Sequence, residues 1–297
     1  MGLIEQAINE VDQGVQTSGK PRRAKLEQGN PFDLDLEMLR RGGFFVPGKA
    51  HGNQPFELRS IKRRLLRRLG MLQRGAGSRH ASRGGGRPRN LVVVTSTRPG
   101  EGKTFTAINL ALSFAFENQQ SVLLIDGDAP RPKLRKILGL PEGPGLSDKI
   151  LNSKLDPGAY LHDIKSAPLT VMTEGSRVDD ATALYGSTRA QAVFADIASR
   201  DPNRLVIVDA PPLLATTETV ALARHADEVI FVVEADKTPE PAAATALDEL
   251  LELNPNVSLV LNRCLVTAGG SHYEAYEHYD RSDSGSSGKA DNDRARG

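Results

Sequence analysis

The chain has 297 residues, of which 39% are hydrophobic and 25% charged, and its formal net charge is +1. This length and apolar content allow one large or two smaller globular domains, and they exclude a wholly disordered chain. A single cysteine, Cys264, excludes an internal disulfide framework and fits a reducing compartment. The sequence has neither an apolar run long enough to span a membrane nor an N-terminal apolar signal core, so we expect a cytoplasmic protein.

The first part of the chain alternates helical patterns with polar segments. Residues 2–16 place apolar side chains on one helical face and predict a short amphipathic helix. Residues 17–33 are polar and predict a linker, and a short helical piece is expected over residues 36–41. Residues 74–89 are mainly Gly, Ser and Arg and predict a flexible tether, at which we place a domain boundary.

Residues 56–72 predict a strongly basic amphipathic helix. Its apolar positions are Leu58, Ile61, Leu65, Leu69 and Leu72, and Arg and Lys occupy most of the remaining positions. Two interpretations are open. Either the helix docks on its own domain with a solvated charged face, or it binds an anionic membrane, an acidic partner or nucleic acid without sequence preference.

A phosphate-binding loop follows the tether. Residues 91–94 predict a buried strand and residues 104–117 predict a helix. Between them the sequence reads Thr97-Arg98-Pro99-Gly100-Glu101-Gly102-Lys103-Thr104. Glycines permit the tight turn that lets backbone N–H groups converge on an anion, and the helix start adds its positive dipole end. The segment is typical of a Walker A loop, although Thr97 stands where the pattern has its first glycine.

The rest of the chain alternates apolar runs with helical patterns. Strands are expected over residues 121–125, 169–172, 205–208, 228–233 and 257–261, and helices over residues 189–199, 217–225 and 241–253. Continuous apolarity predicts strands covered on both faces, as in a doubly wound, mainly parallel α/β sheet. In such sheets ligands bind at the carboxyl ends of the strands.

Three carboxylates follow predicted strands at that edge. Asp126 and Asp128 come after residues 121–125, and Asp209 comes after residues 205–208. Mg²⁺ takes few protein ligands, so Thr104 with one or two of these carboxylates would suffice to hold it. A remaining carboxylate would be free to accept a proton or to orient a water molecule.

Three of the five tyrosines lie near the C-terminus, at Tyr273, Tyr276 and Tyr279. They follow the last predicted strand and precede a segment of Ser, Gly, Asp and Arg that we expect to be disordered. Clustered aromatic side chains in such a tail indicate a function.

These motifs together resemble the bacterial tyrosine kinases of polysaccharide biosynthesis, and more narrowly the autokinases of exosortase-type exopolysaccharide systems. The resemblance rests on the Walker A segment Gly100–Thr104, the Walker A′ segment Leu123–Asp128 and the Walker B segment Val206–Pro212. The N-terminal Leu3-Ile4-Glu5 and the helix containing Glu57 to Arg63 also look like that narrower group.

The resemblance implies a P-loop NTPase fold and an ATP- and Mg²⁺-dependent autokinase. In such a kinase Lys103 would stabilise the transferred phosphoryl group and Asp128 would be the base that accepts the tyrosine proton. Thr104 and Asp126 would hold Mg²⁺, and Asp209 would contribute through the metal or its water. The implied ATP-binding residues are Thr97, Arg98, Pro99, Gly100, Glu101, Gly102, Lys103, Thr104, Phe105, Asn262 and Arg263. The implied acceptors are Tyr273, Tyr276 and Tyr279. The corresponding domains are an N-terminal extension (1–89), a kinase domain (90–266) and a tyrosine-bearing tail (267–297).

The family also implies partners. These are an inner-membrane polysaccharide co-polymerase that holds the protein at the inner face of the membrane, further copies of the chain in a ring, and a phosphotyrosine phosphatase. No specific nucleic acid is implied. Two features depart from the family pattern: Arg131 stands one place later than the usual arginine, and Glu57, Arg59 and Lys62 give a shifted version of the oligomerisation motif.

Two alternatives remain open. One is a deviant-Walker switch ATPase of the kind that positions plasmids or division sites, but Arg98 occupies the place of its signature lysine. The other is a nucleotide-dependent adaptor without kinase activity, whose basic helix binds a membrane protein or nucleic acid.

Overall fold

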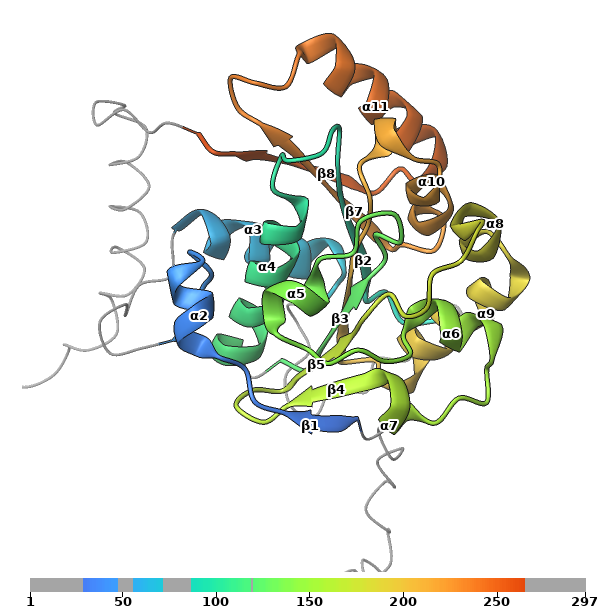
Figure 1. The fold of residues 1–297 in the computed structure, drawn as a ribbon. Helices are drawn as coiled ribbons and strands as arrows, with labels where there is room; N and C mark the ends of the chain where they lie inside the picture. The colour runs from blue at the N-terminus through green and yellow to red at the C-terminus, as the bar shows by residue number, and fades with distance from the viewer. Residues whose placement is uncertain (1–28, 48–55, 72–86, 119, 265–297) are drawn as a thin grey trace, which may run out of the picture. The chain divides into compact units, whose positions relative to one another are not determined.

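The computed structural model describes residues 29–47, 56–71, 87–118 and 120–264. Within these residues an eight-stranded sheet forms the centre, with helices on both faces (Figure 1). The strands are β1 (Asn30–Phe32), β2 (Leu91–Ser96), β3 (Val122–Asp126), β4 (Leu161–Ile164), β5 (Leu169–Met172), β6 (Leu205–Asp209), β7 (Glu228–Glu234) and β8 (Val257–Asn262). The helices are α2 (Leu36–Arg41), α3 (Phe56–Arg68), α4 (Lys103–Asn118), α5 (Leu134–Leu138), α6 (Leu146–Leu151), α7 (Pro157–Tyr160), α8 (Ala181–Tyr185), α9 (Thr188–Arg200), α10 (Glu218–Ala223) and α11 (Glu240–Leu253), with a 3₁₀ turn η1 (Leu213–Ala215).

The strand order is β1-β4-β5-β3-β6-β2-β7-β8. Neighbouring strands pair in parallel except β4 and β5, so the expected mainly parallel, doubly wound sheet is confirmed. Alternate residues of one strand enter different cores. On β2, Val92 and Val94 join the core that contains α4, whereas Leu91 and Val93 join the core that contains α6, α8 and α9. This explains why the strand sequence is continuously apolar.

Among the described residues the predicted strands and helices are confirmed to within two residues, except that the helix expected over residues 56–72 ends at Arg68. The sheet edge formed by β1 and β4 and the short helices α5 to α8 were missed. The polar linker prediction for residues 17–33 is wrong for residues 30–32, which form β1. This strand is held by hydrogen bonds at both of its ends. Gly29 N donates to Asp163 Oδ2 at 2.7 Å, and Lys165 N donates to Phe32 O at 3.1 Å. Pairing with β4, rather than apolar burial, therefore makes this segment a strand.

The basic helix α3 docks on its own domain. Leu65 of α3 and Leu69, which directly follows the helix, are buried in the core that contains α4. Lys62 is buried as well, with Nζ 2.7 Å from Glu117 Oε2 and 5.2 Å from the ring centre of Phe114. The first of the two interpretations of this helix therefore holds for its apolar face. On the opposite face the exposed basic residues are Arg59, Arg63, Arg64 and Arg67.

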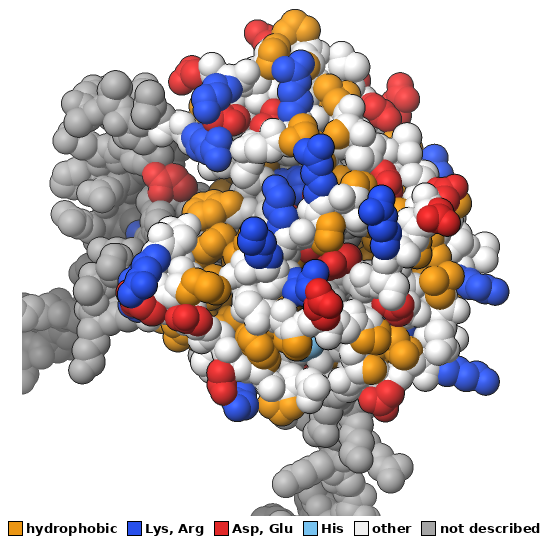
Figure 2. Space-filling model, viewed as in Figure 1, with side chains coloured by type: hydrophobic (Ala, Val, Ile, Leu, Met, Phe, Trp, Pro, Cys, Tyr) orange, Lys and Arg blue, Asp and Glu red, His pale blue; other side chains and the backbone are white. Residues whose placement is uncertain are grey.

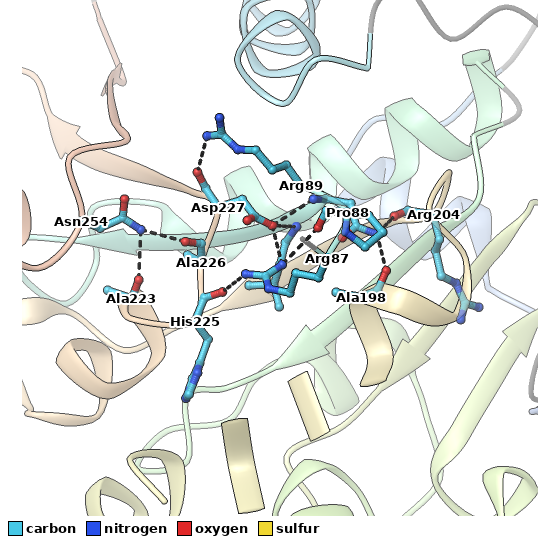
Figure 3. A network of polar contacts seen from close by, with 12 residues as sticks. Arg87, Pro88, Arg89, Ala198, Arg204, Ala223, His225, Ala226, Asp227 and Asn254 are labelled. Carbon is cyan, nitrogen blue, oxygen red and sulfur yellow. Dashed lines mark hydrogen bonds and ion pairs between the residues drawn. The ribbon is translucent and has the colours of Figure 1, made fainter. Parts of the chain in front are cut away.

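A polar clamp joins the start of β2 to distant segments (Figure 3). The carboxylate oxygen Oδ2 of Asp227 accepts from Arg87 Nη1 at 2.8 Å and from the backbone N–H groups of Asn90 and Leu91 at 2.9 Å. Arg87 Nη2 also donates to the carbonyl of His225 at 2.7 Å. The predicted tether is therefore wrong for its last residues, because Arg87 anchors the strand that leads into the phosphate loop.

No helix among the described residues has the length and apolarity needed to cross a bilayer. The chain divides into two compact units, residues 1–262 and residues 263–297, and only Arg263 and Cys264 of the second are described. The helix expected over residues 2–16 and the tyrosines Tyr273, Tyr276 and Tyr279 lie outside the described residues.

Candidate active site

The predicted Walker A loop joins β2 to α4. Gly100 and Gly102 have φ angles of 95° and 101°, a region that glycine adopts without the strain other residues incur. The Glu101 carboxylate stabilises this turn from both sides. Its Oε2 accepts from Arg98 N at 3.0 Å, and its Oε1 accepts from Thr238 Oγ1 at 2.6 Å. The loop is therefore held in its tight conformation by Glu101, a residue whose role the sequence did not reveal.

Lys103 lies at the centre of the predicted carboxylates. Its Nζ is 2.6 Å from Asp128 Oδ2 and 3.6 Å from Asp209 Oδ1, and all three side chains are buried. Burial lowers the pKa of Lys103, but Asp209 and Asp128 outweigh it, so the net effect raises this pKa. The ammonium group thus stays charged. The structure brings together the lysine and carboxylates that the sequence placed at one sheet edge.

Asp126 is bound by the backbone of the loop that follows β3. Its Oδ1 accepts from Asp128 N at 3.1 Å, and its Oδ2 accepts from Lys133 N and Leu134 N, both at 2.9 Å. Burial and the neighbouring Asp209 carboxylate raise the pKa of Asp126. In the structure Asp126 therefore stabilises the conformation of the loop over residues 127–134. The sequence did not predict this role.

Asp209 is fully buried, and neither of its carboxylate oxygens has a hydrogen-bond partner in the described part of the chain. Burial raises its pKa to about 6, although the Lys103 ammonium acts in the opposite direction. Buried polar atoms without partners indicate a place for a water molecule or an ion. Thr104, whose Oγ1 is 3.4 Å from Lys103 Nζ, belongs to the same group of side chains.

The described residues contain no group of three or more His, Cys, Asp or Glu side chains arranged to hold a metal ion. A Mg²⁺ site next to a phosphate loop does not need one, because Mg²⁺ keeps several waters and takes its other ligands from phosphates and one or two protein oxygens. The Asp209 carboxylate, whose Oδ1 lies 3.6 Å from Lys103 Nζ, and the hydroxyl of Thr104 fit such a site. Asp126, predicted as a further metal residue, is the least available because of its three N–H donors.

Two further predicted ATP-binding residues, Asn262 at the end of β8 and Phe105 in α4, flank the loop. Asn262 Nδ2 donates to Glu101 O at 2.9 Å, which places the end of β8 against the phosphate loop. Phe105 is 41% exposed, and its ring centre is 5.1 Å from that of Phe44. The adenine contact of Asn262 and the contribution of Arg263 stay predictions.

The segment that contains Phe44 and Phe45, before α3, contacts the beginning of α4, and nothing in the sequence indicated this beyond the two adjacent phenylalanines. Phe45 N donates to Asn109 Oδ1 at 2.6 Å, and Asn109 Nδ2 donates to Phe105 O at 2.8 Å. Residues far upstream of the Walker loop therefore stabilise the helix that begins at Lys103.

The parallel sheet, the glycine loop and the lysine–aspartate cluster define a nucleotide-binding domain of the P-loop NTPase class. No protein-family model matches the chain. The tyrosine-protein kinase YwqD of Bacillus subtilis is 32% identical over 166 residues, which cover 55% of this chain and 68% of that protein. The putative tyrosine-protein kinase CapB of Staphylococcus aureus is 25% identical over 186 residues, 62% of this chain and 80% of that protein.

A solved structure agrees with these relatives. The kinase domain of VpsO matches with a TM-score of 0.55 and 29% identity, over 60% of this chain and 86% of that domain. The chain belongs to the bacterial tyrosine-protein kinases. The resemblance to the bacterial tyrosine kinases, drawn from the Walker motifs, is thereby confirmed, and the switch ATPase and the adaptor are not better supported. The narrower resemblance to the exosortase-type group stays a prediction.

Proposed function

We propose that the protein is a tyrosine autokinase that transfers the γ-phosphoryl group of ATP to Tyr273, Tyr276 and Tyr279. The observation that carries this proposal is the contact of Lys103 with Asp128 and Asp209 beside a glycine loop. A switch ATPase needs only to bind and hydrolyse ATP. A kinase also needs a base for the acceptor hydroxyl, and Asp128 is the carboxylate available for that role.

The residues of the site support a division of tasks. When ATP binds, Lys103 would move from Asp128 to the phosphates. Asp128 would then be free to accept the proton of the tyrosine hydroxyl. The tyrosine oxygen then forms its bond to the γ-phosphorus as the bond to the leaving ADP oxygen breaks. Thr104 and Asp209 would hold Mg²⁺, which neutralises phosphate charge when bound. Thr97 and the residues through Phe105 would enclose the phosphates, and Asn262 and Arg263 would lie toward the adenine.

We further propose that this activity regulates the polymerisation and export of an exopolysaccharide or capsule. The support is membership in a family whose members include the putative tyrosine-protein kinases EpsB and AmsA and the tyrosine-protein kinase wzc. The exposed arginines of α3 offer a surface for an inner-membrane co-polymerase or for further copies of the chain. We place the protein at the inner face of the membrane through such a partner, with the kinase domain over residues 90–266 and the acceptor tail over residues 267–297.

The test is phosphotyrosine mapping by mass spectrometry after incubation of the full chain with Mg-ATP. We expect phosphate on the C-terminal tyrosines of the wild-type chain and none after Lys103→Met or Asp128→Asn. The matched control is Lys154→Met, which changes an exposed lysine outside the site. ATP hydrolysis without phosphotyrosine, with an activating membrane partner also present, would instead establish a switch ATPase.

A further inference from the structure

The loop after β3 places two exposed basic residues, Arg131 and Lys133, next to Asp126 and Asp128. Arg131 N donates to Asp128 Oδ1 at 3.1 Å, and Lys133 N donates to Asp126 Oδ2 at 2.9 Å. Their backbones are therefore fixed against the catalytic carboxylates, while their side chains are exposed. Arg98, at the second position of the phosphate loop, is exposed as well. We call Arg98, Arg131 and Lys133 the basic rim.

In the described part of the chain none of the three side chains of the basic rim makes an ion pair, whereas Arg135 and Lys237 do. Arg135 Nη1 lies 2.7 Å from Glu142 Oε1, and Lys237 Nζ lies 2.7 Å from Glu234 Oε1. Figure 2 shows Lys and Arg side chains gathered on the face that carries α5 in Figure 1. Uncompensated cations beside a reaction site attract an anionic ligand.

The candidate acceptor segment carries the complementary charge in a regular pattern. Residues 271–280 read Ser-His-Tyr-Glu-Ala-Tyr-Glu-His-Tyr-Asp. Each tyrosine is followed immediately by an acidic residue: Glu274, Glu277 or Asp280. The residues immediately before the three tyrosines are His272, Ala275 and His278, none of them acidic. A site that reads this pattern needs a cation next to the base, on the side where the residue after the tyrosine lies.

The geometry points to the basic rim as that cation. We propose that Arg131 and Lys133 bind the carboxylate that follows the acceptor tyrosine, so that the enzyme selects Tyr-Glu and Tyr-Asp sequences. Consecutive Cα atoms are about 3.8 Å apart, so a tyrosine whose hydroxyl reaches Asp128 brings the next side chain close to the adjoining loop. Arginine suits this role because its planar guanidinium pairs with a carboxylate through two hydrogen bonds.

This inference rests on the proposed kinase activity, and its test separates the two. The enzyme is the full chain with Tyr273, Tyr276 and Tyr279 changed to Phe, so that its own tail does not compete. One substrate is a peptide with the sequence of residues 271–280. The other is the same peptide with Gln, Gln and Asn in place of Glu274, Glu277 and Asp280. For each peptide kcat and KM are measured at saturating Mg-ATP, and the KM for ATP is measured separately.

We expect the KM of the acidic peptide to be about tenfold lower than that of the neutral peptide, because a charge-assisted contact is worth about that factor. Arg131→Ala with Lys133→Ala should raise the KM of the acidic peptide about tenfold and leave the neutral peptide and ATP unchanged. The enzyme that carries Arg131→Glu and Lys133→Glu should instead have its lowest KM for a peptide with Lys after each tyrosine. A merely structural role of the two residues would not produce this reversal of charge preference. Lys154→Ala is the matched control.

Two outcomes would overturn the inference, and a third would overturn the kinase activity on which it rests. Equal KM values for the two peptides would show that the rim does not read the acidic residue. A rise in the KM for ATP in the Arg131→Ala, Lys133→Ala enzyme, without a change for the peptide, would assign the rim to the nucleotide phosphates. Phosphorylation of neither peptide, together with no tail phosphorylation in the chain that keeps its tyrosines, would mean that the proposed kinase activity itself fails.

Discussion

The Nζ of Lys103 lies 2.6 Å from Oδ2 of Asp128, so the lysine of the phosphate loop and the candidate base form a buried ion pair. Removing one partner of a buried pair leaves the other charge uncompensated, which costs about 3–5 kcal/mol. The cost here is increased by Asp209, which also faces Lys103. Removing Lys103 alone should therefore destabilise the chain even before any phosphate enters the site.

We therefore predict that Lys103→Met lowers the free energy of unfolding of the ligand-free chain by about 3 kcal/mol or more. Combining it with Asp128→Asn should recover part of that loss, because the second change removes one of the carboxylates left unpaired. Urea unfolding of the two single variants and the double variant measures this coupling. Additive losses would show that the two side chains are independent in solution.

The two glycines of the loop should differ in their response to alanine. At Gly100 a Cβ would meet nothing within 4 Å, so Gly100→Ala should cost only backbone strain of about 1–2 kcal/mol. At Gly102 a Cβ would collide with the side-chain amide of Asn262 as well. We predict that Gly102→Ala weakens ATP binding more than Gly100→Ala does, because the Asn262 amide must move away, and that adding Asn262→Ala restores part of the affinity.

The matched control for strain alone is Gly139→Ala, because Gly139 also has a positive φ of 71° and open space around it. Equilibrium binding of a fluorescent ATP analogue and urea unfolding give the two readouts. Equal ATP affinities for Gly102→Ala and Gly139→Ala would mean that Asn262 does not restrict the loop.

The central strands could be predicted from the sequence because burial on both faces leaves a continuous apolar run, as in Val92 and Val93. The strand β1 could not, because Asn30–Phe32 is short and its stability depends on β4, more than a hundred residues away. Local patterns carry no information on such distant pairing. The same holds for Arg87, whose partner Asp227 is separated from it by 140 residues.

The candidate site was predictable where topology alone places residues, as with Asp126 and Asp209 on adjacent strands. The hydrogen-bond partners of the individual carboxylate oxygens were not predictable, because these partners depend on the path of a loop. Asp126 accepts from Lys133 N and Leu134 N only because residues 127–134 turn back over it. Likewise Glu101 stabilises the phosphate loop through Thr238, which follows a different strand.

The clamp at the start of β2 makes a prediction about stability. Asp227 accepts three hydrogen bonds through Oδ2 alone, and its side chain is only 10% exposed. Bonds to a charged group contribute about 1.5–3 kcal/mol each, and their loss leaves Arg87 and two backbone N–H groups without this partner. Asp227→Ala should therefore lower the free energy of unfolding by about 3 kcal/mol or more.

Asp227→Asn should be milder, because an amide oxygen can still accept from the backbone. The control is Asp248→Ala on the exposed face of α11, which should change the free energy of unfolding by less than about 0.5 kcal/mol. Urea denaturation of the three variants is the measurement. A loss for Asp227→Ala no larger than that for Asp248→Ala would contradict the contacts drawn in Figure 3.

A pH dependence follows from His225, whose ring stacks on Phe194 with centres 4.9 Å apart. Burial, with a smaller effect of Arg87 and Arg224, lowers its pKa, although its contact with the Tyr185 carbonyl opposes this. The folded chain then binds fewer protons than the unfolded chain. The contribution of His225 to the free energy of unfolding is therefore complete above the pKa of about 6.5 in the unfolded chain, and it is lost as pH falls below that value.

We predict that the difference in unfolding free energy between the wild-type chain and His225→Gln decreases as pH falls from 7.5 to 5.5, and that it is constant between pH 8 and 9. Comparing the two chains cancels the contributions of Asp126 and Asp209, whose raised pKa values act in the opposite direction. A difference that is independent of pH from 5.5 to 9 would mean that His225 is not neutral and buried in solution.

The docking of α3 on α4 gives the last prediction. Leu65 and Leu69 are 3% and 2% exposed, so truncating either to alanine should lower the free energy of unfolding by about 2–5 kcal/mol. Arg64→Ala, on the exposed face of the same helix, should change it by less than about 0.5 kcal/mol. A single cooperative transition in urea is expected for all three variants, because the helix belongs to the same compact unit as the sheet. If Leu65→Ala behaves like Arg64→Ala, the helix is not docked in solution, and its apolar face is then available to a partner.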